Sequence, residues 1–174
     1  MKILITAIGC PGFTTVYESI KKIYRNIEVH GCDIQRNTNE NLVDQFVIVP
    51  QGKSDNYIEA ILSYCVENKI THVVPMSDDE IVAIGCNIEK FNVHSIDIFG
   101  EARGNIENIF NKAKLYKSLK ELGFVPRFCH VKNSKDFLDA YQHFASSNTK
   151  MCIKPSLSHG SRGFALIEAL SYED

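Results

Sequence analysis

A lysine at the end of an apolar run is followed by a loop of small residues within Met151–Glu168. Lys154 comes directly after Cys152 and Ile153 and precedes Pro155, so we expect the strand to end there and the ammonium group to lie beside the loop. Serine and glycine allow backbone N–H groups to turn toward an anion. The loop residues of this kind are Ser156, Ser158, Gly160, Ser161 and Gly163. Because a charge-assisted contact to phosphate is worth ~1.5–3 kcal/mol, the pattern predicts a hairpin that holds nucleotide phosphates.

Two other polar residues of this loop have less definite roles. Arg162 adds a phosphate contact or is simply solvated, and the sequence leaves both interpretations open. His159 has the chemistry of a general acid or base. No neighbour in the sequence orients it, so we expect its ring to face solvent.

A serine and three acidic residues, Ser77-Asp78-Asp79-Glu80, follow the predicted strand 71–76. Open α/β sheets form their binding crevice at this end of their strands, which makes Asp78 and Glu80 candidates for contacts to a substrate. Acidic residues are also favoured in the first turn of a helix by the helix macrodipole. Both interpretations remain open from the sequence.

The turn Gly9-Cys10-Pro11-Gly12 lies between a predicted strand and a predicted helix, and Asp33 ends the second strand. A dinucleotide-binding fingerprint occupies this position in Rossmann proteins, but its pattern is G-x-G-x-x-G. The pattern here is G-x-x-G, and Pro11 lacks an N–H donor. The sequence therefore supports an NAD site only weakly.

The amino-acid composition limits the classes of protein to which the chain can belong. The 174 residues are 44% hydrophobic and 23% charged, which predicts a folded chain with one full domain and part of another. A net charge of −2 gives no long-range attraction for nucleic acid, and no apolar run reaches bilayer-spanning length. We expect a cytoplasmic protein without nucleic-acid or membrane partners. The widely spaced cysteines predict reduced, mostly buried thiols and no metal site; they are Cys10, Cys32, Cys65, Cys86, Cys129 and Cys152.

Short β-rich runs alternate with amphipathic stretches over the first hundred residues, which predicts a parallel sheet with crossover helices. The predicted strands are 3–7, 27–32, 45–49, 71–76 and 93–99, and the predicted helices are 13–24, 55–68 and 81–91.

From Gly100 onward the pattern predicts a smaller α+β unit. A helix lies within 104–122 and ends at Gly123 as its C′ residue. Ser134 is the expected N-cap of the next helix. The remaining predicted elements are strand 125–131, helix 134–144, strand 151–155 and strand 163–168.

The order of these motifs resembles the ATP-grasp superfamily, and the whole chain resembles the N-terminal portion of its carbamoyl-phosphate-synthase-like ligases. Asn111-Lys112 heads a helix that leads to Leu122-Gly123-Phe124-Val125-Pro126, and Lys154 follows with its loop. The implied fold class is α/β. A Rossmann-like preATP-grasp sheet domain spans residues 1–100, and a small, truncated first lobe of the ATP-grasp module spans 101–174.

The resemblance also implies roles for individual residues. Lys154 and Lys112 bind ATP phosphates, with Lys114 and Lys117 near enough to compete for the role of Lys112. The small-residue loop, including Arg162, closes over those phosphates.

The sheet domain of such ligases helps to form the carboxylate or acceptor side of the cleft. That placement makes Gly9, Asp78 and Glu80 the substrate-side candidates.

The implied activity is that of an ATP-dependent carboxylate–amine ligase, which forms a C–N bond through an acyl phosphate. The implied cofactors are ATP and Mg²⁺, the partners are a small carboxylate and an amine, and a homodimer is one option. In the family, the adenine hinge and the Mg²⁺ ligands follow the loop. The acidic residues after the loop, Glu168, Glu173 and Asp174, come too soon to be those ligands, so we expect no metal site in the chain and no activity from it alone.

Two other functions remain open. The chain could be a non-catalytic module for small-molecule binding or assembly with the same fold. An NAD-binding Rossmann protein is the third hypothesis, although it leaves the C-terminal hairpin unexplained.

Overall fold

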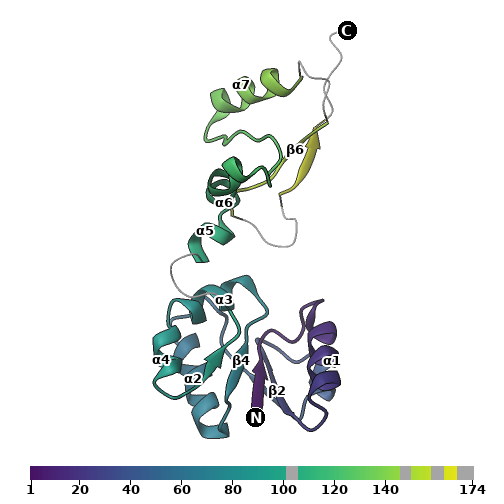
Figure 1. Cartoon of the computed structure of the whole chain (residues 1–174), viewed down its shortest axis with the longest axis vertical. Helices are drawn as coiled ribbons and strands as arrows, with labels where there is room; N and C mark the ends of the chain where they lie inside the picture. Colours follow the sequence, from purple (N-terminus) through teal and green to yellow (C-terminus); the bar gives the residue numbers. More distant parts are fainter. Residues whose placement is uncertain (101–105, 146–149, 158–162, 168–174) are drawn as a thin grey trace. The chain divides into compact units, whose positions relative to one another are not determined.

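The structure is a computed structural model that describes residues 1–100, 106–145, 150–157 and 163–167. The chain divides into two compact units, Met1–Ile106 and Glu107–Asp174 (Figure 1).

The first unit is built on a parallel sheet of five strands in the order β3-β2-β1-β4-β5. The strands are β1 (Lys2–Ile5), β2 (Glu28–Asp33), β3 (Gln45–Ile48), β4 (His72–Val74) and β5 (Asp97–Ile98). This architecture confirms the predicted Rossmann-like parallel sheet. The topological switch point lies between β1 and β4, because the chain runs outward from β1 to β2 and β3 and then returns to β4 and β5 on the other side of β1.

Helices cover both faces of this sheet (Figure 1). They are α1 (Phe13–Ile23), the 3₁₀ helix η1 (Thr38–Asn41), α2 (Tyr57–Asn68), α3 (Asp78–Gly85) and α4 (Ile88–Asn92). Successive residues of β1 point to opposite faces. Ile3 and Ile5 pack in the cluster under α1, and Leu4 packs in the cluster under α2, α3 and α4. The sheet is therefore buried on both sides.

The helix predicted over 81–91 is two helices. Ser77 caps α3, since its Oγ accepts a hydrogen bond from the backbone N–H of Glu80, and this cap starts the helix three residues earlier than predicted. Asn87 ends the regular pattern by donating its side-chain amide to the carbonyl of Ala83 over 2.9 Å. A side chain that bonds the backbone in this way competes with helix continuation.

The second unit contains helices α6 (Lys112–Leu119) and α7 (Ser134–Ala145), the 3₁₀ helix η2 (Lys120–Leu122), and a two-stranded antiparallel sheet. The strands are β6 (Met151–Ile153) and β7 (Ala165–Ile167), and a short helix, α5 (Ile106–Phe110), leads into the unit. Asn111 caps α6 by accepting from the N–H of Lys114, which separates α5 from α6. Gly123 follows η2 with φ of +72°, as predicted for a residue after a helix end.

The predicted strand over 125–131 is wrong. This segment is irregular, and among the described residues β6 pairs only with β7. A strand forms when a neighbouring strand satisfies its backbone groups, and 125–131 has no such neighbour in the described part of the chain.

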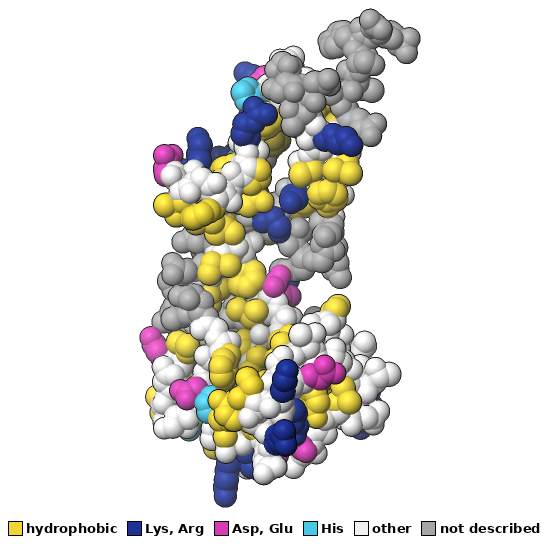
Figure 2. All heavy atoms as spheres, turned by 45° about the vertical axis from the view of Figure 1, so that its right-hand side comes forward, with side chains coloured by type: hydrophobic (Ala, Val, Ile, Leu, Met, Phe, Trp, Pro, Cys, Tyr) yellow, Lys and Arg dark blue, Asp and Glu magenta, His cyan; other side chains and the backbone are white. Residues whose placement is uncertain are grey.

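The two units differ in how much apolar surface they bury. Two clusters of buried residues fill the first unit, whereas no described residue of the second unit is buried. Figure 2 shows hydrophobic side chains on the surface of the second unit. Phe124 is 80% exposed, Leu166 71% and Leu157 68%. In the described residues, no helix is long and apolar enough to span a bilayer.

Candidate functional site

The candidate phosphate site lies where helix α6 meets the end of strand β6. The backbone N–H of Lys112, the first residue of α6, donates a 2.9 Å hydrogen bond to the carbonyl of Ser156. Ser156 lies two residues after Lys154, which directly follows β6. The fold therefore brings the start of α6 next to the start of the predicted loop, although 44 residues separate Lys112 from Ser156 in the sequence.

A glycine, Gly163, stands where the loop ends before β7. Gly163 has φ of +73°, and a Cβ placed on it would lie 2.6 Å from Cγ of Pro155. Real Cβ atoms do not approach so closely, and L residues rarely adopt this φ. Glycine at this position lets the two ends of the loop pack against each other.

Four of the predicted phosphate-binding residues, Ser158, Gly160, Ser161 and Arg162, lie outside the described residues, as does His159. Lys112, Lys154, Ser156 and Gly163 lie within them.

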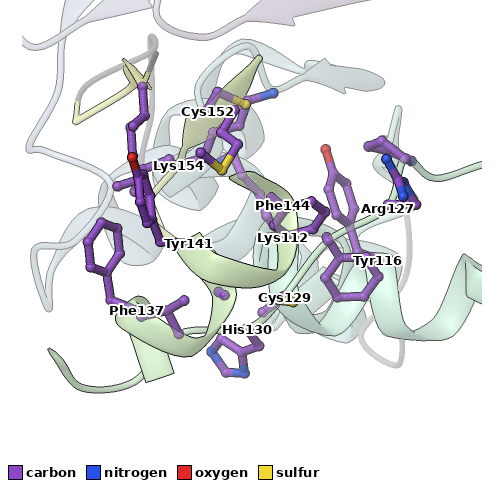
Figure 3. A pocket seen from close by; sticks show the side chains of 18 of the residues that line it. Lys112, Tyr116, Arg127, Cys129, His130, Phe137, Tyr141, Phe144, Cys152 and Lys154 are labelled. Atoms are coloured by element: carbon purple, nitrogen blue, oxygen red, sulfur yellow. The ribbon is translucent and has the colours of Figure 1, made fainter. Parts of the chain in front are cut away.

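A cavity of about 640 Å³ opens beside these lysines. Helices α6 and α7, the segment 126–131 and strand β6 line it, and both Lys112 and Lys154 contribute to its wall (Figure 3). The aromatic lining residues are Tyr116, Phe128, Phe137, Tyr141 and Phe144. The lining is mostly apolar with cations at its border, which suits a ligand with a flat apolar part and an anionic part.

Sequence reasoning missed this aromatic lining. A signal was present, since Phe137, Tyr141 and Phe144 recur at the i, i+4, i+7 spacing of one helix face. Tyr116 and Phe128 meet edge to face with ring centroids 5.4 Å apart, and Arg127 lies 5.9 Å from the centroid of Phe144. The contact between Tyr116 and Phe128 joins α6 to a segment whose fold the sequence did not reveal.

At the carboxyl edge of the first unit's sheet, Asp33 closes the turn after β1. Its Oδ2 accepts a 2.7 Å hydrogen bond from the N–H of Gly9, and its Oδ1 accepts from the N–H of Ile34. A Cβ on Gly9 would lie 2.9 Å from the same Oδ2. The carboxylate that would hold a ribose in a dinucleotide site is thus engaged with the protein's own backbone.

The acidic run after β4 forms the first turn of α3. Asp78 is half-buried, and Asp79 forms a 3.1 Å ion pair with Lys53. Glu80 is buried, and its carboxylate accepts a 2.6 Å hydrogen bond from the hydroxyl of Thr6. Burial raises the pKa of Glu80.

Glu80 lies close to two other buried polar side chains, Thr6 and Tyr57. Burial also raises the pKa of Tyr57, whose hydroxyl lies near Thr6 and Glu80 but makes no hydrogen bond of good geometry with a described residue. The backbone of Gly52 packs against the backbone of Glu80, since a Cβ on Gly52 would lie 2.9 Å from the backbone nitrogen of Glu80. The carboxyl group of Glu80 is therefore enclosed by protein.

The expectation of mostly buried cysteines is wrong. All six are free thiols, but only Cys32 and Cys65 are buried, and burial raises the pKa of Cys65 to about 12. Cys129 and Cys152 are exposed and line the cavity of the second unit. The second unit has no buried core among its described residues that could enclose these two thiols.

No cluster of His, Cys, Asp or Glu able to hold a metal occurs among the described residues.

Comparison with known proteins identifies the fold. The structure of PurK, an N5-carboxyaminoimidazole ribonucleotide synthetase in complex with ADP, matches 96% of this chain with a TM-score of 0.66 and 12% identity, over 41% of its own length. The biotin carboxylase domain of Hydrogenobacter thermophilus 2-oxoglutarate carboxylase, solved with MgADP and bicarbonate, matches 96% with a TM-score of 0.58 and 18% identity, over 37% of its length. Rhizobium etli pyruvate carboxylase matches 96% with a TM-score of 0.60 and 14% identity, over 15% of its length.

The chain thus has the fold of the N-terminal part of these ATP-grasp enzymes, as predicted, and spans about two fifths of the length of the first two. No protein of curated function matches it in sequence. Residues 3–99, more than half of the chain, match the model of the PylC-like N-terminal domain. The chain belongs to the PylC-like N-terminal domain family.

Proposed function

We propose that the chain is the N-terminal part of an ATP-dependent carboxylate–amine ligase that acts through an acyl phosphate. The observation that carries this proposal is the hydrogen bond from Lys112 to Ser156, which places the head of α6 beside the residue pair that follows Lys154. Two related folds were solved with ADP, which supports a nucleotide at this site.

The distribution of charge supports the same assignment. Residues 107–174 hold ten Lys and Arg against seven Asp and Glu, whereas residues 1–106 hold nine against fourteen. The excess of cations in the second unit favours an anionic ligand there, despite the net negative charge of the whole chain.

In this proposal, Lys154 and Lys112 neutralise the charge that develops on the transferring phosphoryl group. The loop that contains Ser156, Ser158, Gly160, Ser161, Arg162 and Gly163 covers the phosphates and excludes water from the acyl phosphate. The described residues supply cations but no carboxylate cluster, so the proposal assigns no Mg²⁺ ligand and no metal-dependent step to them.

The carboxyl edge of the sheet in the first unit is the proposed substrate side. Gly9 and Asp78 lie there as direct candidates. The burial of Glu80 supports an indirect role, in which it holds this edge through its hydrogen bond to Thr6.

The chain by itself should bind ATP no better than about millimolar, or ~4 kcal/mol, because a few phosphate contacts leave the base solvated. Calorimetric titration with Mg-ATP tests the affinity, and an ADP-release assay across candidate carboxylates and amines tests turnover, which should be absent. Lys154→Ala and Lys112→Ala should each weaken binding, whereas Lys135→Ala, on the exposed start of α7, should not.

Three results would count against the proposal as stated. Equal loss of ATP binding in Lys135→Ala would indicate unspecific attraction to a basic surface. A larger loss of ATP affinity in Lys117→Ala than in Lys112→Ala would indicate that Lys117 is the phosphate-binding lysine of α6. Micromolar affinity or substrate-dependent ADP release from the 174 residues alone would mean that a complete site lies within them.

A further inference from the structure

The ammonium group of Lys154 lies over an aromatic ring of the same hairpin. Its Nζ is 5.8 Å from the ring centroid of Phe164, within the range of a cation–π contact. Strands β6 and β7 are antiparallel, and Cys152 lies opposite Leu166. Lys154 directly follows β6 and Phe164 directly precedes β7, so continuing the register by one pair beyond Ile153 and Ala165 sets Lys154 opposite Phe164.

The backbone next to this pair is tightly held. Pro155 follows Lys154, Gly163 precedes Phe164, and these two neighbours are in such close contact that Gly163 has no room for a Cβ. This contact holds the backbone before Phe164 against the residue that follows Lys154, so the two side chains start from adjacent positions.

A lysine side chain has four rotatable bonds, and an exposed one samples many rotamers. A ring face that holds the ammonium group restricts this freedom before a ligand arrives. Lys154 is exposed, and Phe164 remains 44% exposed, so an anion can reach the ammonium group while it is held.

We infer that Phe164 is a positioning residue, whose ring holds the Lys154 ammonium group on the hairpin face where it receives phosphate. The inference rests on the proposed function, because it assigns to Phe164 the orientation of a phosphate-binding lysine. Phe164 acts through Lys154 and takes no part in the chemistry itself.

The experiment uses the whole chain and follows the ε-methylene protons of Lys154 by nuclear magnetic resonance. Their signal is assigned by its loss in Lys154→Arg. A ring face shifts nearby protons upfield, so in the wild type and in Phe164→Tyr this signal should lie upfield of the ordinary lysine position. Lys21 should be shifted in the same way, because its Nζ lies 5.8 Å from the ring centroid of Tyr17. In Phe164→Leu it should return to the ordinary lysine position.

Titration with inorganic triphosphate measures the consequence for binding. Phe164→Leu should weaken the affinity about two- to five-fold, the range of an exposed cation–π contact, and Phe164→Tyr should keep the wild-type affinity. Phe124→Leu is the matched control, because Phe124 is 80% exposed and the same change there should alter neither the Lys154 signal nor the affinity.

The outcomes separate the two proposals. A Lys154 signal at the ordinary position in the wild type, or an unchanged signal and affinity in Phe164→Leu, would overturn the inference. An upfield signal that triphosphate does not perturb at millimolar concentration would overturn the proposed function and, with it, the positioning role. The wild-type signal alone decides the ring contact if Phe164→Leu does not fold.

Discussion

The backbone N–H of Lys112 donates a 2.9 Å hydrogen bond to the carbonyl of Ser156, and this bond joins the start of a helix to the start of a loop 44 residues later. The N–H groups at the start of a helix lack intrahelical partners. Here one of them is satisfied by the carbonyl of the segment that follows Lys154. The bond holds the start of the loop next to α6, which is why we propose that both lysines belong to one site.

Gly163→Ala should destabilise the β6–β7 hairpin by about 1–3 kcal/mol, because a non-glycine residue is strained at this φ and its Cβ would collide with Pro155. Gly123→Ala is the matched control. Gly123 has nearly the same φ, but nothing lies within 4 Å of an added Cβ, so the change should cost only about 1 kcal/mol. Hydrogen exchange of the β6 and β7 amides measures the difference. Equal effects would show that the contact with Pro155 is unimportant.

Glu80→Gln should stabilise the first unit at neutral pH. Burial raises the folded-state pKa of Glu80 above its ordinary value of 4.5. The contribution of Glu80 to folding stability is therefore complete below pH 4.5 and is lost as the pH rises through the folded-state pKa. Glutamine keeps an acceptor for Thr6 and never ionises. The gain should be about 0.5–3 kcal/mol at pH 7 and should vanish near pH 4.

Urea unfolding across this pH range checks the prediction for Glu80. Asp79→Asn is the control, because Asp79 lies next to Glu80 in α3 and its partly exposed carboxylate forms an ion pair with Lys53. Exposed pairs contribute about 0–1 kcal/mol. A stability gain that is independent of pH in Glu80→Gln would contradict the assignment of a buried, titrating carboxyl.

Tyr64→Phe should destabilise the first unit by about 1–3 kcal/mol. His30 is fully buried between two partners, with Nε2 2.8 Å from Glu28 Oε1 and Nδ1 2.8 Å from the hydroxyl of Tyr64. A neutral imidazole that donates from Nε2 must accept at Nδ1. Burial raises the pKa of Tyr64 to about 12, so its hydroxyl stays a donor, and its removal leaves Nδ1 unsatisfied.

Urea unfolding of Tyr64→Phe should be compared with Tyr24→Phe, a hydroxyl deletion at a side chain that is 52% exposed. The second change should be close to neutral. If both variants unfold at the same denaturant concentration, the hydrogen bond to His30 contributes nothing measurable.

The second unit should exchange its amide hydrogens faster than the first. Stability against local opening follows buried apolar contact, and the described residues of 107–167 include none that is buried. Strand β1, with three of its four residues buried, should be the most protected element. Equal protection of β1 and β6 would show that the second unit is stable by itself.

Much of the first unit was predictable because its signals are local. Apolar runs alternating with amphipathic stretches gave the order of strands and helices, and a parallel arrangement follows when helices must cross between strands. The predicted bounds were wrong where a side chain forms a hydrogen bond with the backbone. Ser77 caps α3 and moves its start, and Asn87 bonds the carbonyl of Ala83 and divides one predicted helix into two.

The sequence by itself determined the parallel sheet, the order of its elements and the loop flanked by Lys154 and Gly163, because periodicity and backbone preference depend on near neighbours. Only the tertiary structure decided the burial of Glu80, which requires Thr6, Gly52 and α3 to converge from separate segments. It also decided that 125–131 is no strand, because strand formation depends on a partner and not on the residues of the strand alone.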